Sequence, residues 1–319
     1  MRCEGGRGLA ANLPKVLPLL RALSAGGDRG DNLSRLQDYL DGLEAVATQL
    51  TQEPRRPERA SVVRLLLASD IHDNLFGMRA AARLAGGGGD PVDGVLLAGD
   101  LTDHGTRQEA QLFRRVFGAL AAPVVVVGGN HEDSPAMNEF ARAGYRVLEG
   151  EVAAFAGVRV LGASDPLSGS ARVDSDVALL AAASGRLADL WRTLAPRPQV
   201  LLVHDLRQAQ GVAAAAKAAG EVVLVAYGND HVAGVRRDGS VLLVDAGTAG
   251  ASGYEQIGAG SASAAAAGGS PEPAAELRDR YTFQLLDYSR EAAPQVLAVT
   301  TVSYALDGRT VVDYTPLAE

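Results

Sequence analysis

Cysteine is nearly absent from this sequence, in which Cys3 is the only one among 319 residues. A single cysteine cannot form an intramolecular disulfide, a thiolate cluster or a cysteine-based zinc site. A hydrolase with a cysteine or serine nucleophile lacks support, because Cys3 is remote from the other motifs and no Gly-x-Ser-x-Gly elbow occurs. Nothing in the cysteine content indicates an oxidising compartment, so we expect a cytoplasmic protein.

Long hydrophobic runs are missing as well. No segment approaches the roughly 20 apolar residues that a membrane-spanning helix needs. The apolar segment 16–23 is short and is interrupted by Pro18 and Arg21, so we do not expect a signal peptide. We therefore expect no transmembrane segment in this chain, and a membrane-peripheral location would require an anchor upstream of Met1.

Positive charge is in deficit, since 30 Lys and Arg stand against 38 Asp and Glu and give a formal net charge of −8. A nucleic-acid-binding protein normally carries a basic stripe, so nucleic acid is disfavoured as a partner. A small phosphorylated substrate stays compatible with this charge, because bound metal cations can attract it. The hydrophobic content of 47% indicates a well-buried core.

Residues 1–60 differ in pattern from the rest of the chain. Between residues 31 and 50, apolar residues recur every three or four positions, which predicts an amphipathic helix with Asp31 as its N-cap. Residues 52–60 contain two prolines and several charges and are typical of a linker. We therefore divide the chain into a helical extension with linker at 1–60 and a larger domain at 61–319. The helix 31–50 either packs on that domain or contacts a partner or a membrane-proximal surface.

From residue 61, short apolar runs alternate with helical segments. Capping residues predict where two helices begin, namely Thr106 with Glu109, and Ser134 ahead of Pro135. The alternation predicts an α/β fold in which helices flank central β-sheets. A stretch at about 255–275, rich in Gly, Ala and Ser, is expected to be a flexible surface loop. The predicted strands are residues 62–68, 94–98, 123–127, 158–161, 200–203, 222–226, 241–244, 281–287 and 299–304.

A cluster of side chains that can bind metal follows five of these runs, starting at residues 69, 99, 129, 204 and 228. In an open α/β sheet the carboxyl ends of the strands line one crevice, so these clusters should converge. A lone histidine is more often structural than functional. Here every histidine of the chain falls in a cluster, which chance hardly explains. The five are His72, His104, His131, His204 and His231.

Carboxylate, imidazole and amide ligands together suit divalent ions such as Mn, Fe, Zn or Mg. Two such ions roughly 3.5–4 Å apart can clamp a phosphoryl group and lower the pKa of a bridging water. A carboxylate must bridge them, and Asp100 at a strand end is well suited to that. A further histidine that is not a ligand can protonate the leaving oxygen.

The clusters, taken in order, resemble the motifs of the calcineurin-like metallophosphoesterases. The resemblance spans residues 62 to about 250 and is specific only in the combination of motifs. It implies a layered metallophosphoesterase fold and a metal-dependent hydrolase of phosphate mono- or diesters that uses a metal-bridged hydroxide. The matching blocks are Asp70-x-His72, Gly99-Asp100-x-x-Asp103, Gly129-Asn130-His131-Glu132, His204 and Gly228-x-x-His231.

The resemblance also implies a role for each residue. His131 is similar to the general acid of the family, and Asp103 to the carboxylate that orients it. The implied ligands are Asp70, His72 and His231 for the first ion, Asp100 as the bridge, and Asn130 and His204 for the second ion.

Asn229 departs from the family pattern, which usually has a histidine at that position as a ligand of the second ion. An amide oxygen is a weaker ligand for zinc or iron but suits harder ions. Asn229 therefore ligates with a preference for Mn or Mg, or the second site is weak and fills only with substrate, or the protein is mononuclear or inactive. Asp230 is a poor replacement, because alternation along an extended chain points it away from Asn229.

His104 follows Asp103 where some relatives place an arginine that contacts the substrate phosphate. It either does the same when protonated or is a supporting loop residue. The alternative to an enzyme is a degenerate family member that binds metal or nucleotide with little hydrolysis. The His131–Asp103 pair favours the enzyme, because a binding module has no use for a general acid.

Overall fold

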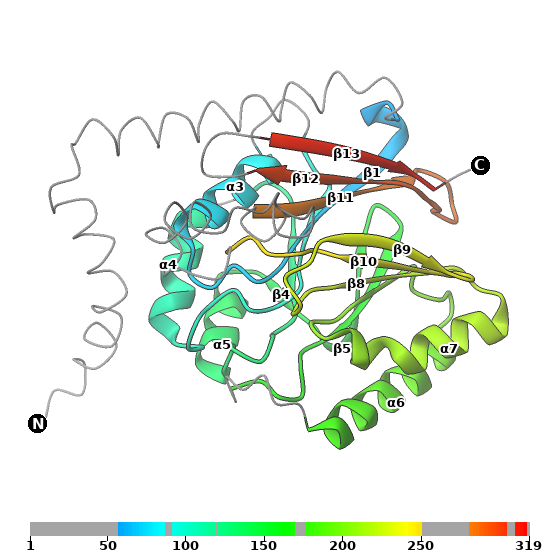
Figure 1. The fold of residues 1–319 in the computed structure, drawn as a ribbon, viewed down its shortest axis with the longest axis horizontal. Coiled ribbons are helices and arrows are strands. Elements are labelled where there is room, and N and C mark those ends of the chain that lie inside the picture. The colour runs from blue at the N-terminus through cyan, green and yellow to red at the C-terminus, as the bar shows by residue number, and fades with distance from the viewer. Residues whose placement is uncertain are drawn as a thin grey trace, which may run out of the picture.

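The computed structural model describes residues 57–86, 91–118, 120–169, 176–250, 281–304 and 310–317. The expected helix 31–50 and the expected loop 255–275 lie outside these residues. In the described ranges, no helix combines the length and the apolar character needed to cross a bilayer. The described chain forms two stacked β-sheets with helices on both outer sides (Figure 1).

The first sheet has seven strands in the order β13-β12-β11-β1-β2-β3-β4, and the second has six in the order β5-β6-β7-β8-β10-β9. The first sheet contains β1 (Val62–Ala68), β2 (Gly94–Leu97), β3 (Val124–Val126), β4 (Arg146–Val147), β11 (Tyr281–Ser289), β12 (Val296–Tyr304) and β13 (Thr310–Pro316). The second contains β5 (Glu149–Phe155), β6 (Val158–Ala163), β7 (Val200–Leu202), β8 (Val223–Tyr227), β9 (Gly234–Asp238) and β10 (Val241–Asp245).

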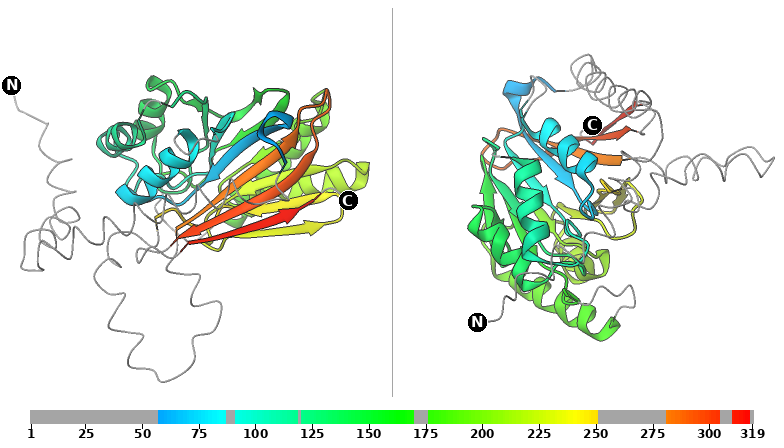
Figure 2. Two further views of the ribbon diagram at one scale, coloured as in Figure 1. Left: turned by 90° about the horizontal axis from the view of Figure 1, so that it is seen from above. Right: turned by 90° about the vertical axis from the view of Figure 1, so that its left-hand side faces the viewer.

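The helices lie in two groups that cover the outer faces of the sheets (Figure 1), and Figure 2 shows the same layers from two further directions. One group packs its apolar side chains on the first sheet, and the other packs on the second. The first group is α3 (Leu75–Gly86), α4 (Arg107–Phe117) and α5 (Ser134–Arg142), and the second is α6 (Val177–Thr193) and α7 (Gln210–Ala219). Two short 3-10 helices, η1 (Arg59–Ser61) and η2 (Leu206–Ala209), complete the described elements.

Strand direction decides where the strand ends meet. In the first sheet β1, β2, β3 and β4 pair in parallel, whereas β11 adds to β1 antiparallel. In the second sheet β6, β7, β8 and β10 pair in parallel, with β5 and β9 antiparallel at the edges. The carboxyl ends of the parallel strands in each sheet therefore share one edge, which is where such folds bind ligands.

Three apolar cores separate the layers. Along β1 every residue is buried, and alternate side chains enter different cores. Leu65 and Leu67 pack between the two sheets, whereas Leu66 packs against the helices α3, α4 and α5. The third core lies between the second sheet and the helices α6 and α7, and it contains the buried Trp191. Burial on both faces explains why the strands are nearly continuous apolar runs.

The sequence-based strands are confirmed with end points shifted by a few residues, and the capping box of Thr106 and Glu109 is present at the start of α4. The expected N-cap at Ser134 is wrong. Asp133 caps α5, and its carboxylate accepts a hydrogen bond from the Ser134 N–H. A carboxylate is an equally good cap, and Pro135 fits either the first or the second helical position. The strands β4, β5, β9 and β13 were not expected, because charged residues interrupt their apolar positions.

A buried ion pair joins the parallel part of the first sheet to its antiparallel part. Arg64 on β1 lies directly opposite Asp287 on β11 in the strand register. The guanidinium donates from Nε to Asp287 Oδ1 at 2.5 Å and from Nη2 to Oδ2 at 2.9 Å. The two side chains are 1% and 0% exposed. Removing one charge of such a pair leaves the other charge buried without its partner. This destabilises the protein more than replacing both side chains by apolar ones.

We expect Asp287→Asn to lower the free energy of unfolding by about 3–5 kcal/mol, because Arg64 keeps its charge and loses the buried carboxylate of Asp287. Urea unfolding, followed by the fluorescence of the single tryptophan Trp191, measures this loss. Asp189→Asn is the matched control, because Asp189 pairs with an arginine at the surface and should change stability by at most about 1 kcal/mol. The double replacement of Arg64 and Asp287 by leucine should cost less than Asp287→Asn alone, and an equal or larger cost would contradict this explanation.

Candidate metal centre

Loops from both sheets meet at the carboxyl edge and bring together side chains that are far apart in sequence. Asp70 and His72 follow β1, Asp100 follows β2, and His204 follows β7. His231 lies in the loop after β8. Main-chain hydrogen bonds connect these loops directly, such as Asp70 N–H to the Gly99 carbonyl at 3.0 Å and Gly228 N–H to the His204 carbonyl at 3.0 Å. The centre is thus built on the rigid ends of buried strands.

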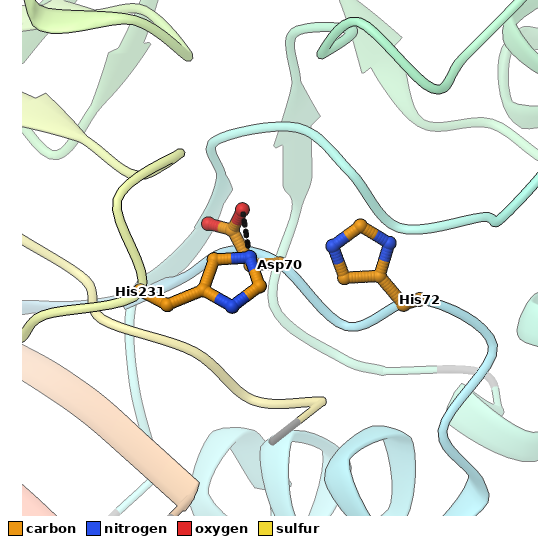
Figure 3. Close-up of side chains that lie close together, drawn as sticks. All are labelled: Asp70, His72 and His231. Atoms are coloured by element: carbon orange, nitrogen blue, oxygen red, sulfur yellow. Dashed lines mark ion pairs between the residues drawn. The ribbon is translucent and has the colours of Figure 1, made fainter. Parts of the chain in front are cut away.

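Asp70, His72 and His231 form the first group of candidate ligands (Figure 3). His231 Nε2 lies 3.2 Å from Asp70 Oδ1, and the rings of His72 and His231 are 5.4 Å apart. Asp70 is fully buried, and Asn229 donates its main-chain N–H to Asp70 Oδ2 at 3.0 Å. Asp70 Oδ1 is buried and accepts no hydrogen bond. An orphaned carboxylate oxygen facing imidazoles fits a bound cation.

Asp100 lies among three histidines. Its Oδ2 is 3.4 Å from His204 Nε2, 3.8 Å from His72 Nε2 and 4.0 Å from His131 Nε2. Asp100 belongs to two of the three potential ligand sets in the described residues, one with His72 and His131 and one with Asp70 and His204. The carboxylate is therefore shared between neighbouring sets, as a bridging ligand would be.

His204 is held with one ring nitrogen toward the centre. Its Nδ1 lies 2.8 Å from the Ala98 carbonyl, which fixes the proton on Nδ1 and leaves the Nε2 lone pair for an ion. Asn130 Oδ1 lies 3.2 Å from the same Nε2. Both side chains are buried. The two side chains therefore lie together beside Asp100, and their assignment to a second ion stays a prediction.

The charges of the centre favour bound cations. Burial alone lowers the pKa of His204, but the carboxylates of Asp100 and Asp70 raise that pKa well above its usual range. Burial also lowers the pKa of His72, but the carboxylates of Asp103, Asp100 and Asp70 outweigh the effect of burial. The pKa of His72 is therefore raised. The buried carboxylates thus favour positive charge at the positions of His204 and His72. A divalent ion supplies that charge in place of the imidazole protons.

The backbone of the centre is unusual. Seven residues other than glycine have positive φ angles in the described chain, and all but Ala156 belong to these loops. Non-glycine residues adopt this region rarely, and such strain concentrates at functional sites. Asp, Asn and His tolerate it best, and the remaining six are of these three types. They are Asp70 (52°), His72 (46°), Asp73 (59°), Asp100 (51°), Asn229 (76°) and His231 (62°).

Asp103 contacts two histidines through different groups. Its main-chain carbonyl lies 2.8 Å from His131 Nδ1, and its carboxylate lies 3.4 Å from His72 Nδ1. The carbonyl thus fixes the ring of His131, while the carboxylate faces a candidate ligand. The sequence-based role of this carboxylate beside His131 stays a prediction.

His104 and Asn229 lie at the margin of the centre. The His104 side chain is 52% exposed, and its Nδ1 lies 3.1 Å from Glu109 Oε1 at the start of α4. This contact suits a supporting loop residue. Asn229 is exposed, and its Nδ2 donates to Asp205 Oδ2 at 3.4 Å. Asp205 is in turn clamped by the guanidinium of Arg207.

Some supporting residues escaped the sequence analysis. Ser69 donates its hydroxyl to the carbonyls of Ala98 and Gly99 at 3.1 and 3.2 Å, and Thr248 donates to the Asp70 carbonyl at 2.9 Å. Thr248 follows β10, outside every motif, so no pattern marks it. Ser69 adjoins Asp70, but a serine in a loop carries no specific signal.

A family model described as the calcineurin-like phosphoesterase superfamily domain matches residues 63–263. The chain belongs to this superfamily. The match confirms the resemblance and the layered α/β fold, and its range contains every candidate ligand. His/Asp clusters that could hold metal are present in this member of the superfamily.

Individual relatives are more distant. Over 50 residues the chain is 38% identical to a protein of Enterobacter lignolyticus (strain SCF1) named glycerophosphodiester phosphodiesterase GpdQ, a match that covers 16% of this chain and 18% of that protein. Among solved structures, TT1561 of Thermus thermophilus is 17% identical over 72% of this chain and all of its own, with a TM-score of 0.47. A novel archaeal phosphodiesterase is 13% identical over 78% of this chain and 99% of its own, with a TM-score of 0.40.

We expect Gly228→Ala to weaken metal binding, because a Cβ there would lie 2.1 Å from Ser69 Oγ and 2.4 Å from Asp70 Oδ2. The new methyl group must displace Ser69 and Asp70, and disturbing the support of a ligand typically costs about 10–100-fold in metal affinity. Titration calorimetry with Mn²⁺ measures the change. Gly185→Ala is the control, because Gly185 lies on α6 with no atom near its Cβ position. Equal affinities in both variants would contradict this account of Asp70.

Proposed function

We propose that the chain is a metal-dependent hydrolase of small phosphate diesters that uses two divalent ions. The observation that carries the proposal is the position of Asp100, whose carboxylate lies within 4.0 Å of imidazole nitrogens from three different loops. Its membership in two ligand sets supports two adjacent ions sharing one carboxylate. Membership in the phosphoesterase superfamily supplies the reaction class.

The residues divide between two ion positions. When bound, the ions supply positive charge that polarises the phosphoryl group and lowers the pKa of a bound water. His231 Nε2 lies beside Asp70 Oδ1, and Asp103 faces the other ring nitrogen of His72. In this proposal Asp70, His72 and His231 would hold the first ion, Asn130, His204 and Asn229 would hold the second, and Asp100 would be shared between them.

His131 protonates the leaving oxygen in this mechanism. Its ring is 25% exposed, so a substrate can reach it, whereas His204 is fully buried. The Asp103 carbonyl accepts a hydrogen bond from Nδ1–H, which leaves Nε2 directed to the side where Asp100 lies. A protonated Nε2 in that place can donate to a departing alkoxide.

Asn229 fits the second ion as an oxygen ligand. Its Nδ2 donates to Asp205, so the amide oxygen is the atom left for an ion. Arg207 holds the Asp205 carboxylate and thereby fixes the orientation of the amide. Amide oxygen suits hard ions, so we propose Mn²⁺ or Mg²⁺ at this position.

The similarity to a protein named as a glycerophosphodiester phosphodiesterase supports a diester substrate. A diester carries one negative charge, which suits a chain of net charge −8 better than a doubly charged monoester. Hydrolysis of bis-p-nitrophenyl phosphate and of p-nitrophenyl phosphate with added Mn²⁺ compares the two classes. Faster turnover of the monoester would contradict the proposed substrate class.

We expect His131→Ala to lower kcat by about 100-fold or more while bound Mn²⁺ per chain stays unchanged, because the variant loses a proton donor and no ligand. Asp100→Asn should lose both Mn²⁺ and turnover, because the shared carboxylate is gone. Elemental analysis together with diester hydrolysis measures both quantities. His131 also belongs to one potential ligand set, and loss of Mn²⁺ in His131→Ala would show that it is a ligand instead of the acid.

We expect Asn229→Ala to reduce the number of bound Mn²⁺ ions from two to one, because the second ion loses an oxygen ligand. Asn229→His should keep two ions and shift the preference toward Zn²⁺, for which imidazole is the better ligand. Calorimetric titrations with Mn²⁺ and Zn²⁺ measure both effects. Asp238→Asn on β9, which pairs with Lys217 at the surface, is the control. Two tightly bound Mn²⁺ ions in Asn229→Ala would exclude Asn229 as a ligand.

A further inference from the structure

One buried carboxylate connects the loop after β2 to the loop after β3. The Glu132 side chain is fully buried. Its Oε2 accepts hydrogen bonds from the main-chain N–H groups of Asp100 and Gly129, both at 2.8 Å. Its Oε1 accepts from Leu101 N–H at 2.8 Å and from Thr102 N–H and Oγ1 at 2.9 and 3.0 Å. Five donors from two loops thus share one carboxylate.

The chemistry of this arrangement requires a carboxylate. All five contacting groups are donors, and a carboxylate has about four lone-pair directions on two acceptor oxygens. A glutamine of the same size would place an NH₂ group against N–H donors at one of the two positions. An apolar side chain would leave four main-chain N–H groups without a partner in a buried place, each at a substantial cost.

The connected loops carry the candidate ligands. Asp100 follows β2, and Asn130 follows Gly129 in the loop after β3. The Asp100 Oδ1 atom also accepts a hydrogen bond from the His131 N–H at 3.0 Å, so the two loops bind each other on both sides of Asp100. The Asp100 backbone has a φ of 51°, a conformation that persists only where surrounding contacts hold it. The Glu132 contact to the Asp100 N–H is one such contact.

We propose that Glu132 is a positioning residue of the metal centre, whose carboxylate clamps the Asp100 and Asn130 loops at the spacing that divalent ions require. This inference rests on the metal centre of the proposed function. Glu132 contacts no ion in this proposal and acts through the main chain of the ligand-bearing loops. Outer partners of this kind usually affect metal affinity by about 10–100-fold.

The test compares Glu132→Gln with Glu139→Gln in the full chain, with Mn²⁺ alone as the probe. Glu139 is also a buried glutamate, but it lies on α5 and pairs with Arg107 instead of the ligand loops. We expect Glu132→Gln to bind Mn²⁺ at least 10-fold more weakly by calorimetry. Glu139→Gln should lower the melting temperature of the metal-free protein and leave Mn²⁺ affinity within twofold of the wild type.

If Glu132→Gln does not fold, a second variant, Glu132→Asp, tests the same inference. Glu132→Asp keeps two acceptor oxygens with a shorter reach, so its Mn²⁺ affinity should fall between those of the wild type and the glutamine variant. The electron paramagnetic resonance spectrum of bound Mn²⁺ should broaden or shift in both Glu132 variants and not in Glu139→Gln. Wild-type affinity in both Glu132 variants, or an equal loss in Glu139→Gln, overturns the inference.

Diester hydrolysis separates this inference from the proposed function. A wild-type protein that binds Mn²⁺ through a Glu132-dependent site but hydrolyses no ester would refute the function and uphold the clamp. If the wild-type protein hydrolyses diesters and the Glu132 variants bind Mn²⁺ as tightly as it does, the proposed function is upheld and the clamp is refuted. Absence of Mn²⁺ binding by the wild type overturns the clamp together with the metal centre on which it depends.

Discussion

The central constraint on this structure is the accumulation of negative charge where two sheets end. Asp70 and Asp100 are 0% and 3% exposed, so water screens them poorly and each needs positive charge close by. Burial raises the pKa of Asp100, but His204, His72 and His131 together hold it below the usual range. The same contacts raise the pKa of His204 and His72. Carboxylates and imidazoles thus depend on one another, and divalent ions meet the same requirement more completely than protons do.

The fold meets this constraint by supplying ligands from strand ends instead of free loops. Parallel strands place their last residues at one edge, and the stacking of two sheets brings Asp100 from the first beside His204 from the second. Glycines allow the close approach, as at Gly129, where a Cβ would lie 2.1 Å from Asp100 Oδ1. Rigid elements hold ligands more accurately than loops do. The apolar cores and the Arg64–Asp287 pair therefore support the site as well as stability.

The sequence predicted the parts of this site that follow from strand-end chemistry. Asp70, His72, Asp100, Asn130, His204 and His231 each follow a buried apolar run, and the structure brings all six together. Sequence periodicity could not predict contacts that depend on three-dimensional burial. The sequence marked Glu132 only as the last residue of a motif block, whereas the structure surrounds its buried carboxylate with five donors. The two groups of Asp103 likewise face different histidines, and the cap of α5 moved from Ser134 to Asp133, because either side chain can accept the same hydrogen bond.

The asparagine at position 229 shows how backbone and ligand requirements compete. Its φ of 76° lies in the left-handed region, where asparagine is favoured because its short polar side chain can form local hydrogen bonds. Asn229 donates its main-chain N–H to Asp70 Oδ2 at 3.0 Å. This hydrogen bond would persist with any side chain at position 229 that permits the same φ. An imidazole would bind a softer ion more tightly, but the Asp205 contact would lose its amide donor. Asparagine therefore suits both the backbone conformation and the Asp205 contact, and under the proposed function its amide oxygen would be the ligand of the second ion.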